Sequence, residues 1–240
     1  MSTSFFVLSK NRSMKTNNND DDNIVSLTNK INYILPRNLM NYYSDNGLFE
    51  STLIEWCKQF CNKDKSIIDI GAHTGTYALS LSSHCKHVYA FEPQKMTYYA
   101  LCGSVALSNM KNITCINKGL GSLEQVGMTT LNIVSNDGGG SSIHNNVSQQ
   151  VIATEQIEII TLDSIELSEI SFIKIDVEDN EKYVLQGSIN TILLSNYPHI
   201  LFECNNLNKH TDLFEFFKKI NYNITLISGF QNMYLAFVDK

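Results

Sequence analysis

The stretch SIIDIGAHTGTYAL, residues 66–79, places an acid and two glycines at the point where an apolar run ends. Asp69 interrupts the apolar residues, Gly71 and Gly75 follow it, and a helical pattern begins at Thr76. Glycine allows the backbone to approach a ligand closely, and a helix N-terminus offers free N–H groups to a carboxylate. The spacing differs from the G-x-G-x-x-G of dinucleotide sites, and Asp69 would repel a pyrophosphate. The stretch therefore favours a ligand that carries an ammonium group.

A second acid ends the next apolar run, YAFEP, where Glu92 stands 21 residues beyond Gly71. An acid at the tip of a neighbouring strand accepts hydrogen bonds from ribose hydroxyls. Glu92 alone would also fit a solvated surface acid, but together with the glycine turn it predicts an adenosine-containing ligand. We place His73, Thr74 and Tyr77 among the residues that contact this ligand, with a role as a base as the alternative for His73.

A third acid, Asp176, ends the run SFIKID, and further acids follow at the start of a helical pattern. Favourable interaction with a helix N-terminus explains Asp179 and Glu181. It explains Asp176 less well, because an ionisable residue at the end of an apolar strand faces the ligand cleft and needs a partner there. We expect Asp176 and Glu178 to serve as base or anchor for a second substrate. Glu203, which ends PHILFE, is the next acid on the same edge.

Lys174 precedes Asp176 by two residues and therefore shares its side of the strand. This placement allows either a salt bridge between the two side chains or a catalytic role for the lysine. Acids gathered at one edge can also bind a divalent cation. Their spacing does not indicate a metal, and we predict none.

Apolar runs alternate with helical patterns over most of the chain. Strands are expected at residues 66–70, 87–91, 113–117, 172–177, 200–203, 223–227 and 233–238, and helices at 76–83, 95–110, 180–194 and 211–220. Such alternation predicts a mostly parallel sheet covered on both faces. The last two strands are joined only by residues 229–232, which forces an antiparallel hairpin. This α/β combination resembles the seven-stranded, Rossmann-like fold of S-adenosylmethionine (SAM)-dependent methyltransferases.

The chain divides into a polar N-terminal segment and one domain. Residues 1–23, with the run NNNDDDN, are expected to be mostly disordered, and residues 24–240 to form the domain. A short hairpin or helix is expected at the start of the domain. Residues 128–162 break the strand–helix alternation and predict an inserted hairpin. Its loop, residues 136–146, contains three consecutive glycines, so we expect a flexible loop and a candidate lid over the substrate.

The totals narrow the class of protein further. The 240 residues carry a net charge of −6, which argues against broad nucleic-acid binding through phosphate contacts. No apolar run approaches the ~18 residues of a transmembrane helix, and the N-terminus does not resemble a signal peptide, so we expect no membrane association. The six cysteines lack a C-x-x-C pair. They are typical of free, buried thiols in a reducing compartment, which predicts a cytoplasmic protein.

Six segments occur in an order that resembles the FkbM family of methyltransferases: DIGAHTGTYAL, VYAFEP, TLDSI, FIKIDVEDNE, VLQGS and PHILFEC. The resemblance covers roughly residues 50–238. It implies the SAM-dependent methyltransferase fold, with Asp69, Gly71 and Gly75 holding the methionine part of SAM and Glu92 its ribose. It also implies that Asp176 and Glu178 lie at the reaction centre and that Glu181 supports them. The family usually has Asn at His73 and Gly at Asp179.

The leading hypothesis is a SAM-dependent O-methyltransferase that acts on a hydroxyl of a small acceptor, a sugar or glycan. Methylation of nucleic-acid amino groups is disfavoured, because the strand end reads DVED instead of a D-P-P-Y-type loop. Two alternatives stay open: a nicotinamide-dependent oxidoreductase, and a non-catalytic module that keeps the fold as a binding surface. The sequence predicts neither the exact acceptor nor the oligomeric state.

Overall fold

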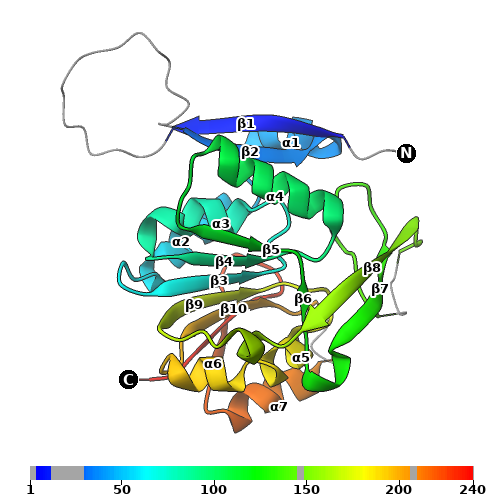
Figure 1. Cartoon of the computed structure of the whole chain (residues 1–240). Helices are drawn as coiled ribbons and strands as arrows, with labels where there is room; N and C mark the ends of the chain where they lie inside the picture. Colours follow the sequence, from blue (N-terminus) through cyan, green and yellow to red (C-terminus); the bar gives the residue numbers. More distant parts are fainter. Residues whose placement is uncertain (1–3, 12–29, 145–148, 206–209, 240) are drawn as a thin grey trace, which may run out of the picture.

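The computed structural model describes residues 4–11, 30–144, 149–205 and 210–239. These residues form a central seven-stranded sheet with the order β11-β12-β10-β9-β3-β4-β5. Its strands are β3 (Ser66–Ile70), β4 (Val88–Phe91), β5 (Ile113–Ile116), β9 (Ile170–Ile175), β10 (His199–Glu203), β11 (Asn223–Leu226) and β12 (Met233–Phe237). Neighbours from β10 to β5 are parallel, whereas β12 is antiparallel to β10 and β11. The predicted fold is confirmed (Figure 1).

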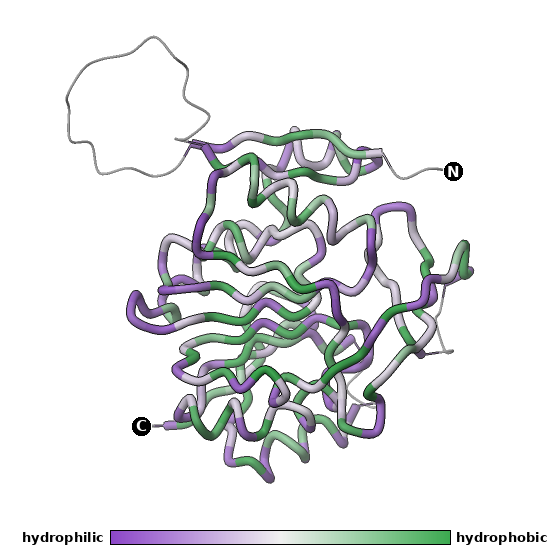
Figure 2. Tube along the Cα trace, viewed as in Figure 1, coloured by the Kyte–Doolittle hydropathy of each residue, from purple (hydrophilic) through white to green (hydrophobic). Residues whose placement is uncertain are grey.

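Helices cover both faces of this sheet. One group is α2 (Ser51–Cys57), α3 (Thr76–Leu81) and α4 (Lys95–Leu107), and the other is α5 (Glu181–Gln186), α6 (Ile189–Leu194) and α7 (Thr211–Lys219). Successive residues of a strand point to opposite faces, so Ile67 packs in the core with α2 and α3, and Ile68 in the core with α5 to α7. Hydrophobic stretches accordingly run through the central strands (Figure 2). None of the described helices is long and apolar enough to span a bilayer.

The helix expected over residues 180–194 was wrong in one respect, because it is two helices, α5 and α6. The chain turns at Gly187, where an added Cβ would lie 2.1 Å from the carbonyl oxygen of Gly121. The Asp163 carboxylate then accepts hydrogen bonds from the backbone N–H groups of Asn190 and Thr191, at 3.0 and 2.8 Å. A new helix N-terminus is therefore capped from a distant segment, which periodicity alone does not reveal.

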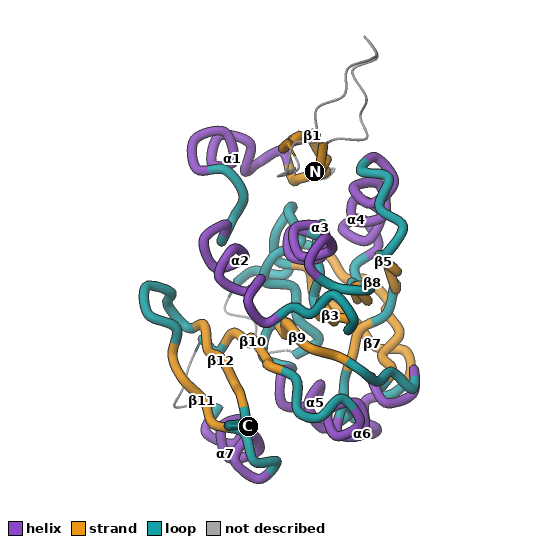
Figure 3. The backbone as a smooth tube through the Cα atoms, turned by 90° about the vertical axis from the view of Figure 1, so that its left-hand side faces the viewer, coloured by secondary structure: helices purple, strands orange, loops and turns teal. Residues whose placement is uncertain are grey.

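Part of the N-terminal segment, residues 1–23, which we expected to be mostly disordered, forms a strand. Strand β1 (Phe5–Asn11) pairs antiparallel with β2 (Lys30–Pro36), and α1 (Met40–Asn46) follows. The edge of β2 docks on α4, since the N–H groups of Asn32 and Ile34 donate to the hydroxyls of Ser108 and Ser104, each at 2.8 Å. The second strand, KINYILP, lies where a short hairpin or helix was expected, and the first strand, FFVLSKN, lies in the segment expected to be mostly disordered. The run NNNDDDN lies outside the described residues. Figure 3 shows this hairpin far from the C-terminal pair β11–β12.

The predicted insertion is confirmed as a hairpin of β7 (Gly127–Ile133) and β8 (Ala153–Ile160). Among the described residues it forms a small sheet with β6 (Gly119–Leu120), and Figure 1 shows this sheet beside the central one. The described part of its loop returns to the body of the domain, where the Gly140 N–H donates to Glu178 at 3.1 Å. Residues 145 and 146 of the expected lid lie outside the described residues, and its flexibility stays a prediction.

Candidate active site

A cavity of about 300 Å³ opens where β3, β4 and β9 end. This is the edge at which open α/β sheets bind ligands. The strand ends supply one wall, and the insertion supplies Leu131, Ile157 and Ile159. A third wall comes from residues 39–50, which precede α2 and include Phe49 and Glu50. Three segments that are distant in the sequence therefore enclose a single site.

The glycine turn after β3 forms part of the wall. Gly71 has a φ of +74°, and an added Cβ would lie 1.9 Å from the carbonyl oxygen of Asp176. Both facts demand glycine, because a side chain here would be strained and would collide with the neighbouring strand end. Gly75, with a φ of +93°, stands directly before α3, and an added Cβ would lie 2.5 Å from Leu79 and 2.6 Å from Leu101. Gly71 lines the cavity, whereas Gly75 shapes the turn from behind.

Glu92 lies at one end of the cavity, after β4, and is 7% exposed. Its carboxylate accepts hydrogen bonds from the His73 N–H at 2.8 Å, the Gln94 N–H at 2.9 Å and the Thr97 hydroxyl at 2.8 Å. These donors hold it in one orientation. Because each carboxylate oxygen can accept more than one hydrogen bond, Glu92 can still receive a ligand hydroxyl.

Two other predicted ligand contacts occupy different places. Among the described residues, neither Asp69 nor Thr74 lines the cavity. The Asp69 side chain is 2% exposed and accepts a hydrogen bond from the Ala78 N–H at 2.9 Å, which fastens the start of α3. Its other oxygen lies 3.8 Å from the ammonium of Lys174. We expected Asp69 to contact a ligand ammonium, and this expectation is corrected. The Lys174 ammonium lies beside the carboxylate instead, and the carboxylate is buried away from the cavity.

His73 and Tyr77 both reach the cavity, as expected. His73 has a φ of +51°, and its imidazole hydrogen-bonds to the carbonyl of Asp137 in the insertion loop. Tyr77 donates its hydroxyl to Glu50 at 2.7 Å. Each of the two side chains therefore ties the glycine turn to a segment that folds over it.

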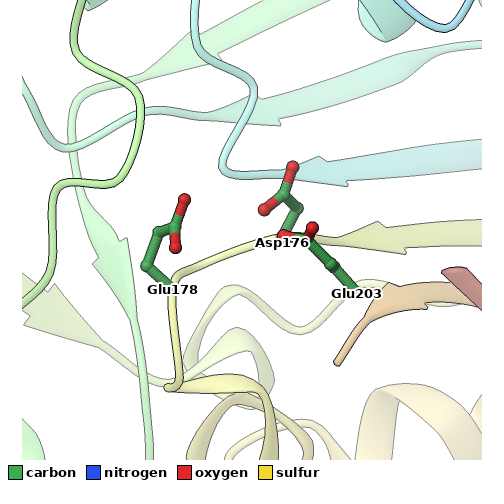
Figure 4. Close-up of side chains that lie close together, drawn as sticks. All are labelled: Asp176, Glu178 and Glu203. Atoms are coloured by element: carbon green, nitrogen blue, oxygen red, sulfur yellow. The ribbon is translucent and has the colours of Figure 1, made fainter. Parts of the chain in front are cut away.

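Three carboxylates lie close together at the opposite end (Figure 4). Asp176 and Glu178 line the cavity, whereas Glu203 is not among the described residues that line it. Asp176 follows β9, Glu203 ends β10, and Glu178 lies on the loop after Asp176; one oxygen of each lies within 4.8 Å of the others. Asp176 forms the salt bridge with Lys174 that the sequence allowed, at 3.2 Å. Lys174 also donates to the Gly71 carbonyl at 2.8 Å. The lysine thereby joins the glycine turn to the acid cluster, and the three oxygens are also close enough to share a divalent cation.

Burial and mutual repulsion alter the protonation of this cluster. Burial, followed by the charges of Asp176 and Glu178, raises the pKa of Glu203 to about 8. Burial and the charge of Asp176 also raise the pKa of Glu178. Near neutral pH, Glu203 consequently holds a proton that it shares in a hydrogen bond with Asp176. The cluster can therefore exchange protons within the physiological range.

Glu181 supports the site without entering it. Its side chain accepts a hydrogen bond from the Val177 N–H at 3.1 Å and so fixes the backbone just after Asp176. Burial raises the pKa of Glu181 to about 8. Among the described residues that line the cavity, Glu181 is absent. The catalytic role that we predicted for Glu181 is therefore corrected to a positioning role.

Sequence reasoning missed two contributors to the site. Glu50 lines the cavity, but it stands in a segment where no spacing marks it, with a φ of +52° that sequence does not announce. The Gly140 N–H, which orients Glu178, belongs to the loop that we expected to be flexible and a candidate lid, without any specific contact to Glu178. The signal that pointed toward this loop was its run of glycines.

The family model of the methyltransferase FkbM domain matches residues 69–224 of this chain. The match covers well over half of the sequence, and the chain therefore belongs to this family and is a methyltransferase. The resemblance inferred from its motifs is confirmed, and the oxidoreductase alternative finds no support. A comparison with curated proteins finds no match.

Solved structures show the same fold at low sequence identity. A methyltransferase FkbM from Methylobacillus flagellatus KT is 18% identical, with a TM-score of 0.50 over 72% of this chain, which spans only 43% of that protein's length. A precorrin-6y C5,15-methyltransferase from Geobacter metallireducens GS-15 is 11% identical, with a TM-score of 0.51, covering 80% of this chain and 90% of that one. A precorrin 8W decarboxylase from Methanobacterium thermoautotrophicum has a TM-score of 0.50, 11% identity and the same coverages of 80% and 90%. These similarities establish the Rossmann-like fold, and the site must identify the substrates.

Proposed function

We propose that this chain transfers a methyl group from SAM to a hydroxyl of a small acceptor, with a sugar or glycan as the acceptor class. One observation carries the proposal: Gly71, Glu92 and Asp176 line a single cavity from the ends of three adjacent strands. Membership of the family accounts for methyl transfer. The cavity combines a place for a nucleoside with carboxylates at the opposite end, as such a reaction requires.

The residues present fit SAM in chemical type. Glu92 offers oxygens to ribose hydroxyls, and the apolar side chains of Leu120, Ile157 and Ile159 offer a surface to an adenine ring. Gly71 leaves its part of the wall free of a side chain. The carboxylates at the Asp176 end suit a ligand that bears positive charge on sulfur and nitrogen.

When bound, SAM supplies a methyl group on an excellent leaving group, so the protein needs to align the acceptor and remove one proton. We assign the removal of the acceptor's hydroxyl proton to the carboxylate of Asp176. The ammonium of Lys174 holds this carboxylate from one side, at 3.2 Å. Glu178, oriented by the Gly140 N–H, is suited to anchor an acceptor hydroxyl. Glu203 supports Asp176 through the hydrogen bond that they share. The insertion lines one wall of the cavity, where it would limit the access of water to the reacting groups.

The acceptor class follows from the same acids. Carboxylates that accept hydrogen bonds from hydroxyls suit a neutral polyol, and the net charge of −6 disfavours a polyanion such as a nucleic acid. The proposal therefore includes a small-molecule or glycan partner and neither a nucleic acid nor a membrane.

The cofactor is tested by calorimetric titration with S-adenosylhomocysteine (SAH), with NAD in parallel. We expect SAH to bind and NAD to give no heat of binding. Methyl-labelled SAM is then incubated with a panel of neutral methyl glycosides, and label in the glycoside establishes the acceptor class. Absence of SAH binding would overturn the cofactor, whereas SAH binding without label in any glycoside would overturn the acceptor class alone.

A further inference from the structure

Glu50 lines the cavity at the end where Asp176 lies. It belongs to a segment that the family model does not match, since the match begins at residue 69. It stands directly before α2, and its side chain is half-buried. The Tyr77 hydroxyl, 2.7 Å away, fixes its carboxylate, and the Tyr77 ring stands over the Lys174 ammonium at 5.5 Å. Because tyrosine is a neutral partner, this hydrogen bond orients the charge of Glu50 without cancelling it.

The positive charges near this end are already engaged. Lys174 lies 3.2 Å from Asp176 and 3.8 Å from Asp69, and it donates to the Gly71 carbonyl. Lys118, on another part of the cavity wall, forms a salt bridge with Glu158. Lys174 and Lys118 thus each have a carboxylate partner other than Glu50, which leaves the charge of Glu50 to act on a ligand.

The geometry of Glu50 thus has a consequence for the two forms of the cofactor. SAM and SAH differ by one methyl group and by the positive charge on sulfur. We infer that Glu50 is a specificity-determining residue that makes the site favour the sulfonium of SAM over the neutral thioether of SAH. This inference rests on the proposed function, because it requires the sulfur to lie near the Asp176 end.

The reaction itself then weakens the binding of its product. Methyl transfer removes the sulfonium charge, and the attraction to Glu50 disappears with it. A fixed charge interacts with a second charge over several ångströms even where solvent partly screens the pair. Glu50 consequently stabilises the loaded enzyme and lowers the affinity for SAH relative to SAM, which limits product inhibition.

The experiment measures the ratio of the dissociation constants of SAH and SAM by calorimetry, on the full chain. Glu50→Gln removes the charge and keeps the shape and an oxygen for the Tyr77 hydroxyl. We expect it to lower this ratio about fivefold, almost wholly through weaker SAM binding. Sinefungin, which carries an amine in place of the sulfonium methyl, should lose affinity in parallel with SAM, because charge and not the methyl group is being read.

The matched control is Glu55→Gln, on α2, whose side chain is 71% exposed and pairs with Lys58. It removes the same charge close by in sequence and should leave the ratio unchanged. Thermal melts verify that each variant folds, and Glu50→Ala provides a second charge-removing variant with the same expected change.

An unchanged ratio in a folded Glu50 variant, or an equal loss of SAM and SAH, would overturn the role of Glu50 while leaving the cofactor intact. If the wild-type chain bound neither SAM nor SAH, the proposed function would fail, and the inference with it. The two failures are therefore distinguishable.

Discussion

The two ends of the cavity surround their carboxylates with opposite kinds of neighbours. At one end, Glu92 is surrounded by donors, namely the N–H groups of His73 and Gln94 and the Thr97 hydroxyl. At the other end, Asp176 faces Glu203 and Glu178, and the pKa values of those two glutamates are raised by burial and by like charge. The first arrangement fixes an acceptor of hydrogen bonds in place. The second arrangement holds carboxylates that can take up or release a proton and can attract a positively charged ligand, which suits the chemical step.

The largest test of this comparison concerns the turn that joins the two ends. Gly71→Ala should destabilise the fold by about 3–5 kcal/mol, since its Cβ would lie 1.9 Å from the Asp176 carbonyl. Gly229→Ala shares the left-handed backbone, with a φ of +86°, but has no atom within 4 Å of its added Cβ, and should cost only about 1 kcal/mol. Urea unfolding of both variants measures the difference. Equal losses would show that strain alone, and not the close approach of β9, requires the glycine.

Paired amide substitutions separate the two ends by ligand affinity. Glu92→Gln places an NH₂ group against the donors that hold the carboxylate, so SAH affinity should fall about 10- to 30-fold. Asp176→Asn should leave SAH affinity within about threefold and lower methyl transfer about 100-fold, because it removes the proton acceptor. Calorimetry and label transfer from SAM read the two effects. Normal turnover by Asp176→Asn would contradict the proposed base.

Glu181 gives the acid cluster a signature in the pH dependence of stability. Burial raises its pKa from 4.5 to about 8 in the folded state. Between these values the folded state holds a proton that the unfolded chain has released, so the free energy of unfolding decreases as pH rises, by at most about 1.4 kcal/mol per pH unit from this group. Glu181→Gln should flatten the decrease between pH 5 and 8.

Glu203 contributes in the same direction, with a pKa of about 8, so part of the slope should remain in Glu181→Gln. Glu215→Gln, at an exposed position on α7, serves as the control and should retain the full slope. Denaturant unfolding across this pH range is the measurement. An identical slope in wild type and Glu181→Gln would contradict the buried, protonated carboxyl.

The smallest expected effect concerns the residue that replaces a glycine of the family motif. Asp179 has a φ of +76°, and its carboxylate pairs with His210 at 2.9 Å. Asp179→Gly relieves the backbone and loses this pair, so the gain in stability should be below about 0.5 kcal/mol. Glu166→Gly, at an exposed residue with a φ of +55°, should gain about 0.5–1 kcal/mol. A larger gain for Asp179→Gly would show that the contact with His210 does not stabilise the loop.

Sequence alone sufficed for the features that local pattern encodes. The alternation of apolar strands and helices, the C-terminal hairpin and the inserted hairpin were all predicted and confirmed. The acids at the ends of strands, Glu92 and Asp176, were also found, because a charge that ends a buried strand must lie at its rim. Parallel strands then bring such residues to the same edge, so the candidate site followed from the strand assignment.

Tertiary structure decided which of these residues enter the cavity. Asp69 lies within β3, one residue before its end, whereas Asp176 follows β9. Asp69 turns inward to α3 and Lys174, where the helix start offers it an N–H donor. Tertiary contacts also place Glu50, through its hydrogen bond with Tyr77 of α3. They place strand β1 through its pairing with β2, which in turn docks on α4. Periodicity records which face of an element is apolar. The partner of each polar group depends on distant segments, and only the folded chain brings those together.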